Sequence, residues 1–168
     1  MKNKKHFFLS ILILVIFIGC TSTTKKSDSD VDRIQLMILP EYMAMDMSQS
    51  GYTEILDNAK KDGILNTNSL EVERVRNISY NLISQTYIFR DDAQEWNWEI
   101  NVIDSELINA FCMPGGKIVV YSGLINKLDA TDDELAAVIG HEIAHALREH
   151  GRERMSSALV QQVGILGF

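Results

Sequence analysis

The stretch VIGHEIAHALREHGRERM, residues 138–155, places two histidines four residues apart, with a glutamate directly after the first. The histidines are His141 and His145, and the glutamate is Glu142. On an α-helix, residues four apart emerge one turn apart on nearly the same face. Two imidazole rings placed in this way can approach one ion from the same side, and zinc accepts imidazole nitrogens. The spacing therefore predicts that His141 and His145 are metal ligands.

The residues before the motif predict the helix that this geometry needs. Thr131, followed three residues later by Glu134, has the form of a capping box at a helix start. No proline occurs over residues 132–150, so we expect one helix over that range. Glu142 then lies about 100° around the helix from His141, where it can flank the ion without binding it. A carboxylate there can take a proton from a water that zinc activates.

A structural helix with incidental His and Glu residues is the alternative. The residues next to the two histidines are uncharged, and they are Ile139, Gly140, Ile143, Ala144, Ala146 and Leu147. This composition predicts that the helix is buried rather than solvated. Three ionisable groups within five residues of a buried helix are costly unless a metal or a partner satisfies them. The pattern therefore favours the metal site.

The chain before this helix is expected to contain further helices and a small sheet. Mixed apolar spacings over residues 31–60, broken by a proline and a glycine, predict one or two short helices. Asn68 and Glu71 are typical of a helix start, and apolar residues at helical spacing extend that helix over residues 69–89.

Three short strands are expected next. Alternating apolar residues over 96–102 have the period of a half-buried strand, and two further strands are expected at 107–112 and 117–121. The Pro-Gly pair at 114–115 has the residue types that a type II turn needs at its centre. We therefore expect a small antiparallel sheet in an α+β fold.

The N-terminus has the form of a secretory signal. A basic start is followed by an apolar run over residues 7–18, which is shorter than the ~20 residues that span a bilayer. The small residue and cysteine that follow resemble the lipobox of bacterial lipoproteins, so Cys20 is the expected lipidation site. An uncleaved anchor is the alternative. We expect residues 1–19 to be the signal peptide, 20–30 a flexible tether and 31–168 the folded domain.

The charge balance excludes a nucleic-acid-binding protein. Without residues 1–19 the chain has 13 basic and 23 acidic side chains, a net charge of about −10, which repels polyanions. If Cys20 carries a lipid, Cys112 has no partner cysteine, so no disulfide framework is expected. Thr21, in place of an aspartate after the lipidated cysteine, favours the periplasmic face of the outer membrane in a bacterium with two membranes.

The stretches NAFCMPGGKIVVYSGLI, TDDELAAVIG and HEIAHALREHGRER together resemble the HtpX and CAAX-prenyl-protease family of zinc metallopeptidases, in its bacterial envelope lipoprotein branch. The resemblance implies a mainly helical, zincin-like metallopeptidase domain with the small sheet beside the HExxH helix. It implies one Zn²⁺ per chain, with His141 and His145 as ligands and Glu142 as general base and acid. Misfolded or unassembled envelope proteins are the implied substrates, and the membrane is the implied partner through the N-terminal lipid.

The family's strand that matches NAFCMPGG lies along the active-site cleft, so the resemblance makes Asn109, Ala110 and Phe111 candidate substrate-binding residues. A plain core strand is the alternative. The family's third zinc ligand is a glutamate on a later helix, but residues 154–168 contain no Asp, Glu, His or Cys. Glu149 cannot replace it on an unbent helix, because each turn climbs about 5.4 Å. We therefore expect the chain to be the N-terminal part of a longer peptidase domain that lacks the helix with the third ligand.

Two functions follow from these expectations. The first is a membrane-anchored zinc metalloendopeptidase that hydrolyses peptide bonds in envelope proteins. The second is a catalytically inactive truncated lipoprotein, or a chaperone-like module that binds client proteins without cleaving them.

Overall fold

The computed structural model describes residues 20–25 and 34–166. The signal peptide expected at residues 1–19 and part of the expected tether lie outside these ranges. In chain order the elements are β1 (Cys20–Thr21), β2 (Gln35–Leu36), α2 (Glu41–Lys61), α3 (Ser69–Ile83), the 3-10 turns η1 (Thr86–Ile88) and η2 (Asp91–Glu95), β3 (Glu99–Ile103), β4 (Ala110–Met113), β5 (Lys117–Tyr121), α4 (Ser122–Asn126), α5 (Asp132–Leu147) and α6 (His150–Leu166). None of the described helices combines the length and the apolar character needed to cross a bilayer.

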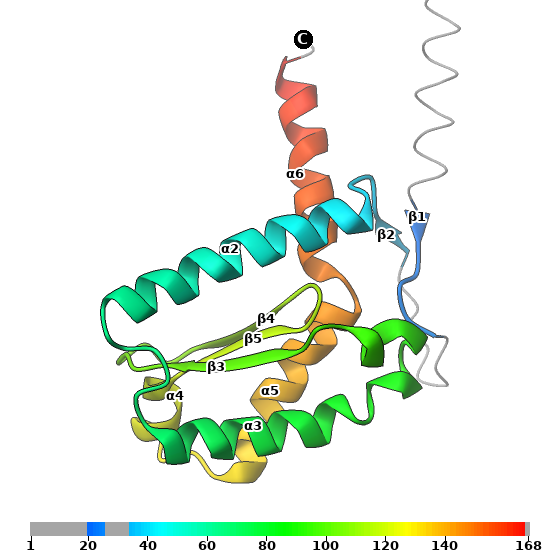
Figure 1. Cartoon of the computed structure of the whole chain (residues 1–168). Helices are drawn as coiled ribbons and strands as arrows, with labels where there is room; N and C mark the ends of the chain where they lie inside the picture. The colour runs from blue at the N-terminus through cyan, green and yellow to red at the C-terminus, as the bar shows by residue number, and fades with distance from the viewer. Residues whose placement is uncertain (1–19, 26–33, 167–168) are drawn as a thin grey trace, which may run out of the picture.

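The small sheet lies between two helical layers (Figure 1), with α2 across one face and α3 and α5 across the other. Alternate residues of β5 supply the two cores. Ile118 and Val120 pack toward α3 and α5, whereas Val119 packs with Tyr52 of α2. This arrangement is an α+β fold, as expected, and it supports α5 on a rigid layer of strands.

The sheet is mixed, so the expected antiparallel sheet is wrong in one respect. Its strand order is β3-β5-β4, with β4 antiparallel to β5 but β3 parallel to it. Residues 117–120 are buried on both faces, which suits a central strand. Because β5 takes the centre, residues 104–109 carry the chain from β3 past β5 to the far edge. Strand β4 is therefore an edge strand.

The turn between β4 and β5 has the expected form. The backbone N–H of Gly116 donates to the carbonyl of Met113 at 3.2 Å, and Gly115 has φ +81°, as the third residue of a type II turn requires. Trp98 packs over this turn and stacks on Trp96, with ring centroids 5.5 Å apart. Both tryptophans precede β3, which begins at Glu99, so the expected strand at 96–102 starts too early.

Two helix ends and the length of a third helix differ from expectation, although the predicted caps are present. Asn68 accepts hydrogen bonds from the backbone at the start of α3, and Thr131 and Glu134 form the capping box of α5. Helix α3 ends at Ile83, before the 3-10 turn, and α5 ends at Leu147. Helix α2 is a single helix of 21 residues, where one or two short helices were expected. An internal glycine costs a helix only about 1 kcal/mol, and packing of α2 on the sheet outweighs it.

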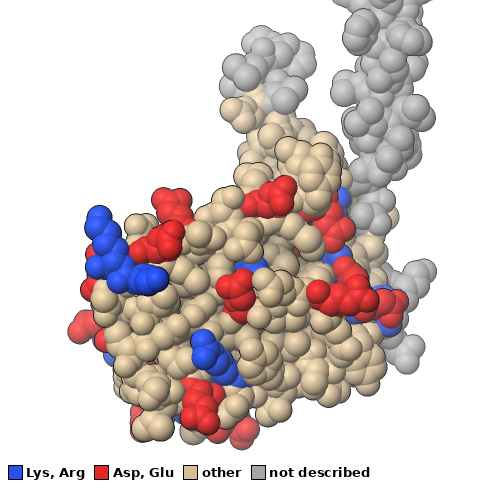
Figure 2. Space-filling model, viewed as in Figure 1, with Lys and Arg blue, Asp and Glu red and all other residues tan. Residues whose placement is uncertain are grey.

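Charged side chains are dispersed over the face shown in Figure 2. Acidic side chains form several separate groups there, with a few basic ones between them, on a surface that is largely uncharged. This distribution agrees with the net charge of −7 for the whole chain.

We predict that the β4–β5 turn depends on the close approach of Trp98. In Gly116→Ala the new Cβ would lie 2.6 Å from Cδ2 of Trp98, whereas in Gly115→Ala it meets nothing within 4 Å. Both glycines have positive φ, so Gly115→Ala is a matched control that carries only the backbone cost of about 1–2 kcal/mol. Gly116→Ala should lower the free energy of unfolding by about 1–3 kcal/mol more, measured by urea denaturation. Equal losses in the two variants would contradict this packing.

Candidate metal centre

Helix α5 has one face in the core and another face over a cleft. Its buried residues are Leu135, Ile139, Ile143, Ala146 and Leu147. The predicted site residues lie elsewhere on the helix: His141 is exposed, and Glu142 and His145 are half-buried. The burial expected around the histidines therefore holds for one face only, and the motif borders open space that a substrate can reach.

The structure brings the two predicted ligand nitrogens together. Nε2 of His141 lies 2.9 Å from Nε2 of His145, and the ring planes are nearly perpendicular at 89°. Zinc binds imidazole nitrogens at about 2.0–2.1 Å, so one ion can contact two nitrogens this close together. The pair therefore suits two of the protein ligands that a zinc site needs. Within the described ranges, no group of three His, Cys, Asp or Glu side chains has a geometry that could hold a metal.

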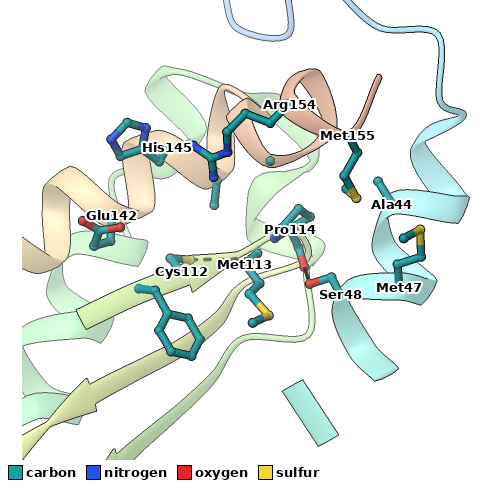
Figure 3. A pocket seen from close by; sticks show the side chains of 13 residues that line it. Ala44, Met47, Ser48, Cys112, Met113, Pro114, Glu142, His145, Arg154 and Met155 are labelled. Atoms are coloured by element: carbon teal, nitrogen blue, oxygen red, sulfur yellow. Dashed lines mark hydrogen bonds between the residues drawn. The ribbon is translucent and has the colours of Figure 1, made fainter. Parts of the chain in front are cut away.

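A cleft of about 560 Å³ opens beside this pair (Figure 3). Helix α5 and strand β4 form two of its walls, and α2 and α6 close the others. The lining residues are Ala44, Met47, Ser48, Phe111, Cys112, Met113, Pro114, Glu142, His145, Ala146, Gly151, Arg154 and Met155. Apolar side chains dominate this lining, so the cleft suits a peptide with apolar side chains.

Cys112 of β4 and Glu142 of α5 line the same cleft. Burial raises the pKa of the Cys112 thiol well above its ordinary value, and the negative charge of Glu142 raises it further. The thiol is free and donates weakly to the carbonyl of Met113. The thiol therefore stays protonated at neutral pH, close to the charge of Glu142.

The three candidate substrate-binding residues have different environments. Asn109 precedes β4, and its carbonyl accepts a hydrogen bond from the N–H of Tyr121. Ala110 is buried, and Phe111 lines the cleft. Backbone groups of an antiparallel strand alternate between its two edges. Since Asn109 bonds toward β5, the backbone groups of Ala110 and Cys112 face the outer edge of the sheet.

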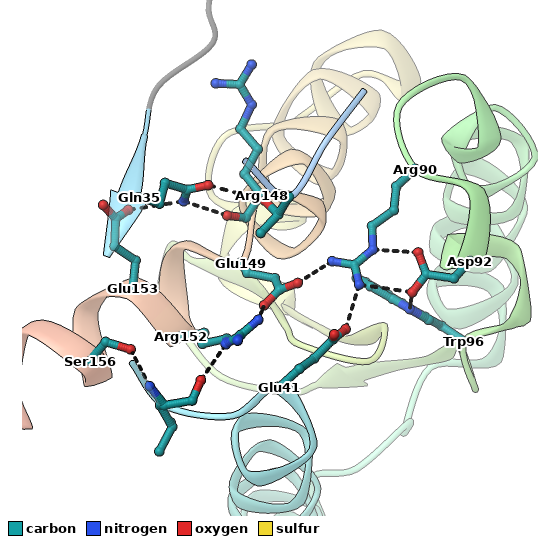
Figure 4. Close-up of polar contacts among 12 residues, drawn as sticks. Gln35, Glu41, Arg90, Asp92, Trp96, Arg148, Glu149, Arg152, Glu153 and Ser156 are labelled. Carbon is teal, nitrogen blue, oxygen red and sulfur yellow. Dashed lines mark hydrogen bonds and ion pairs between the residues drawn. The ribbon is translucent and has the colours of Figure 1, made fainter. Parts of the chain in front are cut away.

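A buried ion cluster sets the boundary between α5 and α6 (Figure 4). Glu149 has φ +49° and is 4% exposed. Its two carboxylate oxygens accept hydrogen bonds from Arg90 at 2.5 Å and from Arg152 at 2.7 Å. Glu149 therefore faces away from the two histidines, and the helix ends before it could supply a third ligand.

Arg90 joins this boundary to the rest of the domain. Besides Glu149 it contacts Glu41 of α2 at 2.5 Å and Asp92 of η2 at 2.6 Å. Burial by itself lowers the pKa of the Arg90 guanidinium, but its hydrogen bonds to Asp92 and Glu149 outweigh burial, so the pKa rises. Sequence reasoning missed this cluster, because Arg90 and Glu149 are 59 positions apart and no local pattern relates them.

His150 is a further side chain at the site, beyond the residues predicted as ligands or general base. It is the first residue of α6, and its Nδ1 lies 2.5 Å from Nδ1 of His145. The turn at Glu149 returns the chain toward α5 and so makes this contact possible.

Comparison with known proteins supplies independent findings. A profile of peptidase family M48 matches residues 69–168. The chain is 33% identical to the mitochondrial metalloendopeptidase OMA1 of Bos taurus over 99% of its length, which is 31% of that protein. It is 48% identical to the metalloprotease LoiP of Escherichia coli over 31% of this chain and 20% of LoiP. It is 36% identical to the beta-barrel assembly-enhancing protease of Yersinia pestis over 39% of this chain and 14% of that protein.

The chain thus spans less than a third of the length of these curated relatives. No solved structure matches it. The family match begins at α3 and includes β4, α5 and α6, which form three of the four walls of the cleft; α2 lies outside it.

We predict that Glu149→Ala strongly destabilises the domain. Arg90 is 8% exposed, and removal of the Glu149 carboxylate leaves its guanidinium buried with one of its three carboxylate partners missing. Breaking a buried ion pair in this way costs about 3–5 kcal/mol. Lys127→Ala is the control, because its pair with Glu106 lies at the surface and should leave the free energy of unfolding nearly unchanged. Chemical denaturation of both variants tests this, and equal stability of the two would contradict it.

Proposed function

Because the chain belongs to peptidase family M48, we propose that it is a zinc metalloendopeptidase whose centre is formed by His141, Glu142 and His145. The proposal rests on one observation. Nε2 of His141 lies 2.9 Å from Nε2 of His145, and the Glu142 carboxylate is next to this pair in a cleft bordered by the edge strand β4. The relatives' names, metalloendopeptidase and metalloprotease, support the same reaction class.

Each side chain has a separate task in this proposal. His141 and His145 would hold one zinc ion through Nε2. When bound, the ion acts as a Lewis acid that polarises the scissile carbonyl and makes water a stronger acid. Glu142 takes the proton from the attacking water and returns it to the leaving amine. A peptide bound in the cleft would limit the access of bulk water to these transfers.

Strand β4 would bind the substrate backbone. The outward-facing groups of Ala110 and Cys112 can pair with an extended peptide, which adds a strand to the sheet edge. Phe111 of β4 and Met47 of α2 would contact the peptide side chains. Only an extended segment fits such an edge, so the proposal favours misfolded or unassembled proteins as substrates. The name of the Yersinia pestis relative, a beta-barrel assembly-enhancing protease, agrees with envelope proteins as that substrate class.

We also propose that the enzyme acts at the cell envelope, tethered by a lipid on Cys20 to the periplasmic face of the outer membrane. In the structure Cys20 pairs with Leu36 in a two-stranded ribbon, and Lys25 forms an ion pair with Asp91. A tether joined in this way would hold the domain close to the membrane surface.

Binding of clients without cleavage is the second candidate function. The edge of β4 would hold an extended client whether or not zinc is bound, so binding and hydrolysis are separable. The two functions differ in whether the bound client is cleaved. Cleavage requires Glu142, whereas binding does not.

We predict that Glu142→Gln abolishes cleavage of an unfolded protein substrate, because the amide cannot accept the proton, while zinc content is retained. Loss of a general base costs about 10²–10⁴-fold in rate. Asp133→Asn, an exposed carboxylate on the same helix, is the control and should cleave at the wild-type rate. Digestion of unfolded casein, followed by gel electrophoresis, measures both.

Three outcomes separate the functions. Cleavage by the wild type that is lost only in Glu142→Gln supports the peptidase. Cleavage by Glu142→Gln at the same rate as by the control Asp133→Asn would refute the role of Glu142. Client binding by the wild type, with zinc bound and no cleavage, would favour the binding module.

A further inference from the structure

His145 presents its two ring nitrogens to two different histidines. Its Nε2 lies 2.9 Å from Nε2 of His141, and its Nδ1 lies 2.5 Å from Nδ1 of His150. We propose that His150 is a positioning residue: its Nδ1 accepts a hydrogen bond from Nδ1–H of His145 and holds that ring with Nε2 directed at the metal. This role rests on the proposed metal centre.

The chemistry of imidazole determines the direction of this hydrogen bond. A neutral ring has one N–H and one lone pair, on different nitrogens. A metal needs the lone pair, so a His145 ring that binds through Nε2 carries its proton on Nδ1. That proton points at His150. Two facing Nδ1 atoms can share only one proton between them, so His150 must offer its own Nδ1 lone pair.

The same geometry makes His150 a poor third ligand. The rings of His145 and His150 have centroids 4.7 Å apart and planes inclined at 63°. His150 approaches the nitrogen of His145 that points away from His141. The proposed ion lies between Nε2 of His141 and Nε2 of His145. An ion in that position cannot also contact His150, which lies at the other ring nitrogen of His145. His150 therefore acts through His145 rather than on the ion.

The break between α5 and α6 creates this contact. On a continuous helix, residue 150 would lie about 140° around the axis from residue 145, facing another direction. In the structure, Glu149 takes φ +49° and α6 begins at His150. Arg90 and Arg152 hold the Glu149 carboxylate, so the His150 backbone is fixed next to the last turn of α5.

A hydrogen bond of this kind has a measurable effect on metal affinity. Metal-binding histidines usually donate their second N–H to a fixed acceptor, which orients the ring and increases its basicity, and loss of that acceptor weakens metal binding by about 10–100-fold. A carboxylate or a backbone carbonyl is the usual acceptor. A histidine can replace it here only in the tautomer described above.

The test compares His150→Leu with His150→Asn in the full chain. The two replacements have nearly the same shape, but Asn places a carbonyl oxygen where His has Nδ1, whereas Leu places a methyl group there. Zinc affinity is measured by competition with a chelating dye, and zinc-free melting temperatures report folding. We expect Leu to weaken zinc binding by about 10–100-fold and Asn to restore affinity to within about threefold of wild type.

Equal affinities of the Leu and Asn variants would overturn the role of His150, whether both match wild type or both are weakened. Histidine ¹⁵N–¹H spectra of the zinc-loaded wild type give a check that needs no variant: the His145 proton should be on Nδ1, and a proton on Nε2 would contradict the proposal. A wild type that binds zinc but cleaves nothing would refute the proposed peptidase and leave this role intact. A folded wild type that binds no zinc would refute both.

Discussion

A buried carboxylate at the end of the HExxH helix sets the geometry of the site. Glu149 takes a positive φ that a side chain adopts at a cost, and ion pairs with Arg90 and Arg152 offset that cost. Arg90 extends the same cluster to α2 and η2. Removing these ions from water is expensive, so the cluster holds only when all the partners are present. The direction of α6, the position of His150 and the α2 wall of the cleft all depend on it.

One face of α5 packs in the core, and the other face carries the candidate site residues. The apolar face packs on a sheet whose central strand is buried on both sides, which fixes the helix over the edge strand β4. The other face carries Glu142 and His145, which line the cleft, and the exposed His141 beside them. Ligands on a rigid helix keep their spacing without help from a flexible loop. The edge strand lies alongside, where an extended peptide would bring its backbone to the same groups.

The parts of the fold that sequence reasoning predicted depend on local patterns. Capping residues Asn68 and Thr131, the Pro-Gly turn and the strand at 117–121 follow from rules that span a few residues. The parts that it missed depend on long-range partners. The parallel pairing of β3 with β5 and the helix break at Glu149 are decided by burial and by Arg90, which a local window cannot include. The role of His150 was missed for the same reason, since an unbroken helix would turn it away from His145.

The metal centre is tested most directly by the zinc content of the purified chain, measured by mass spectrometry after dialysis, in the wild type and in a His141→Ala, His145→Ala double variant. We expect one zinc per wild-type chain and none in the double variant, with unchanged far-UV circular dichroism because both side chains lie outside the core. A double variant that keeps one zinc per chain would contradict this expectation, since the ion would then be held elsewhere.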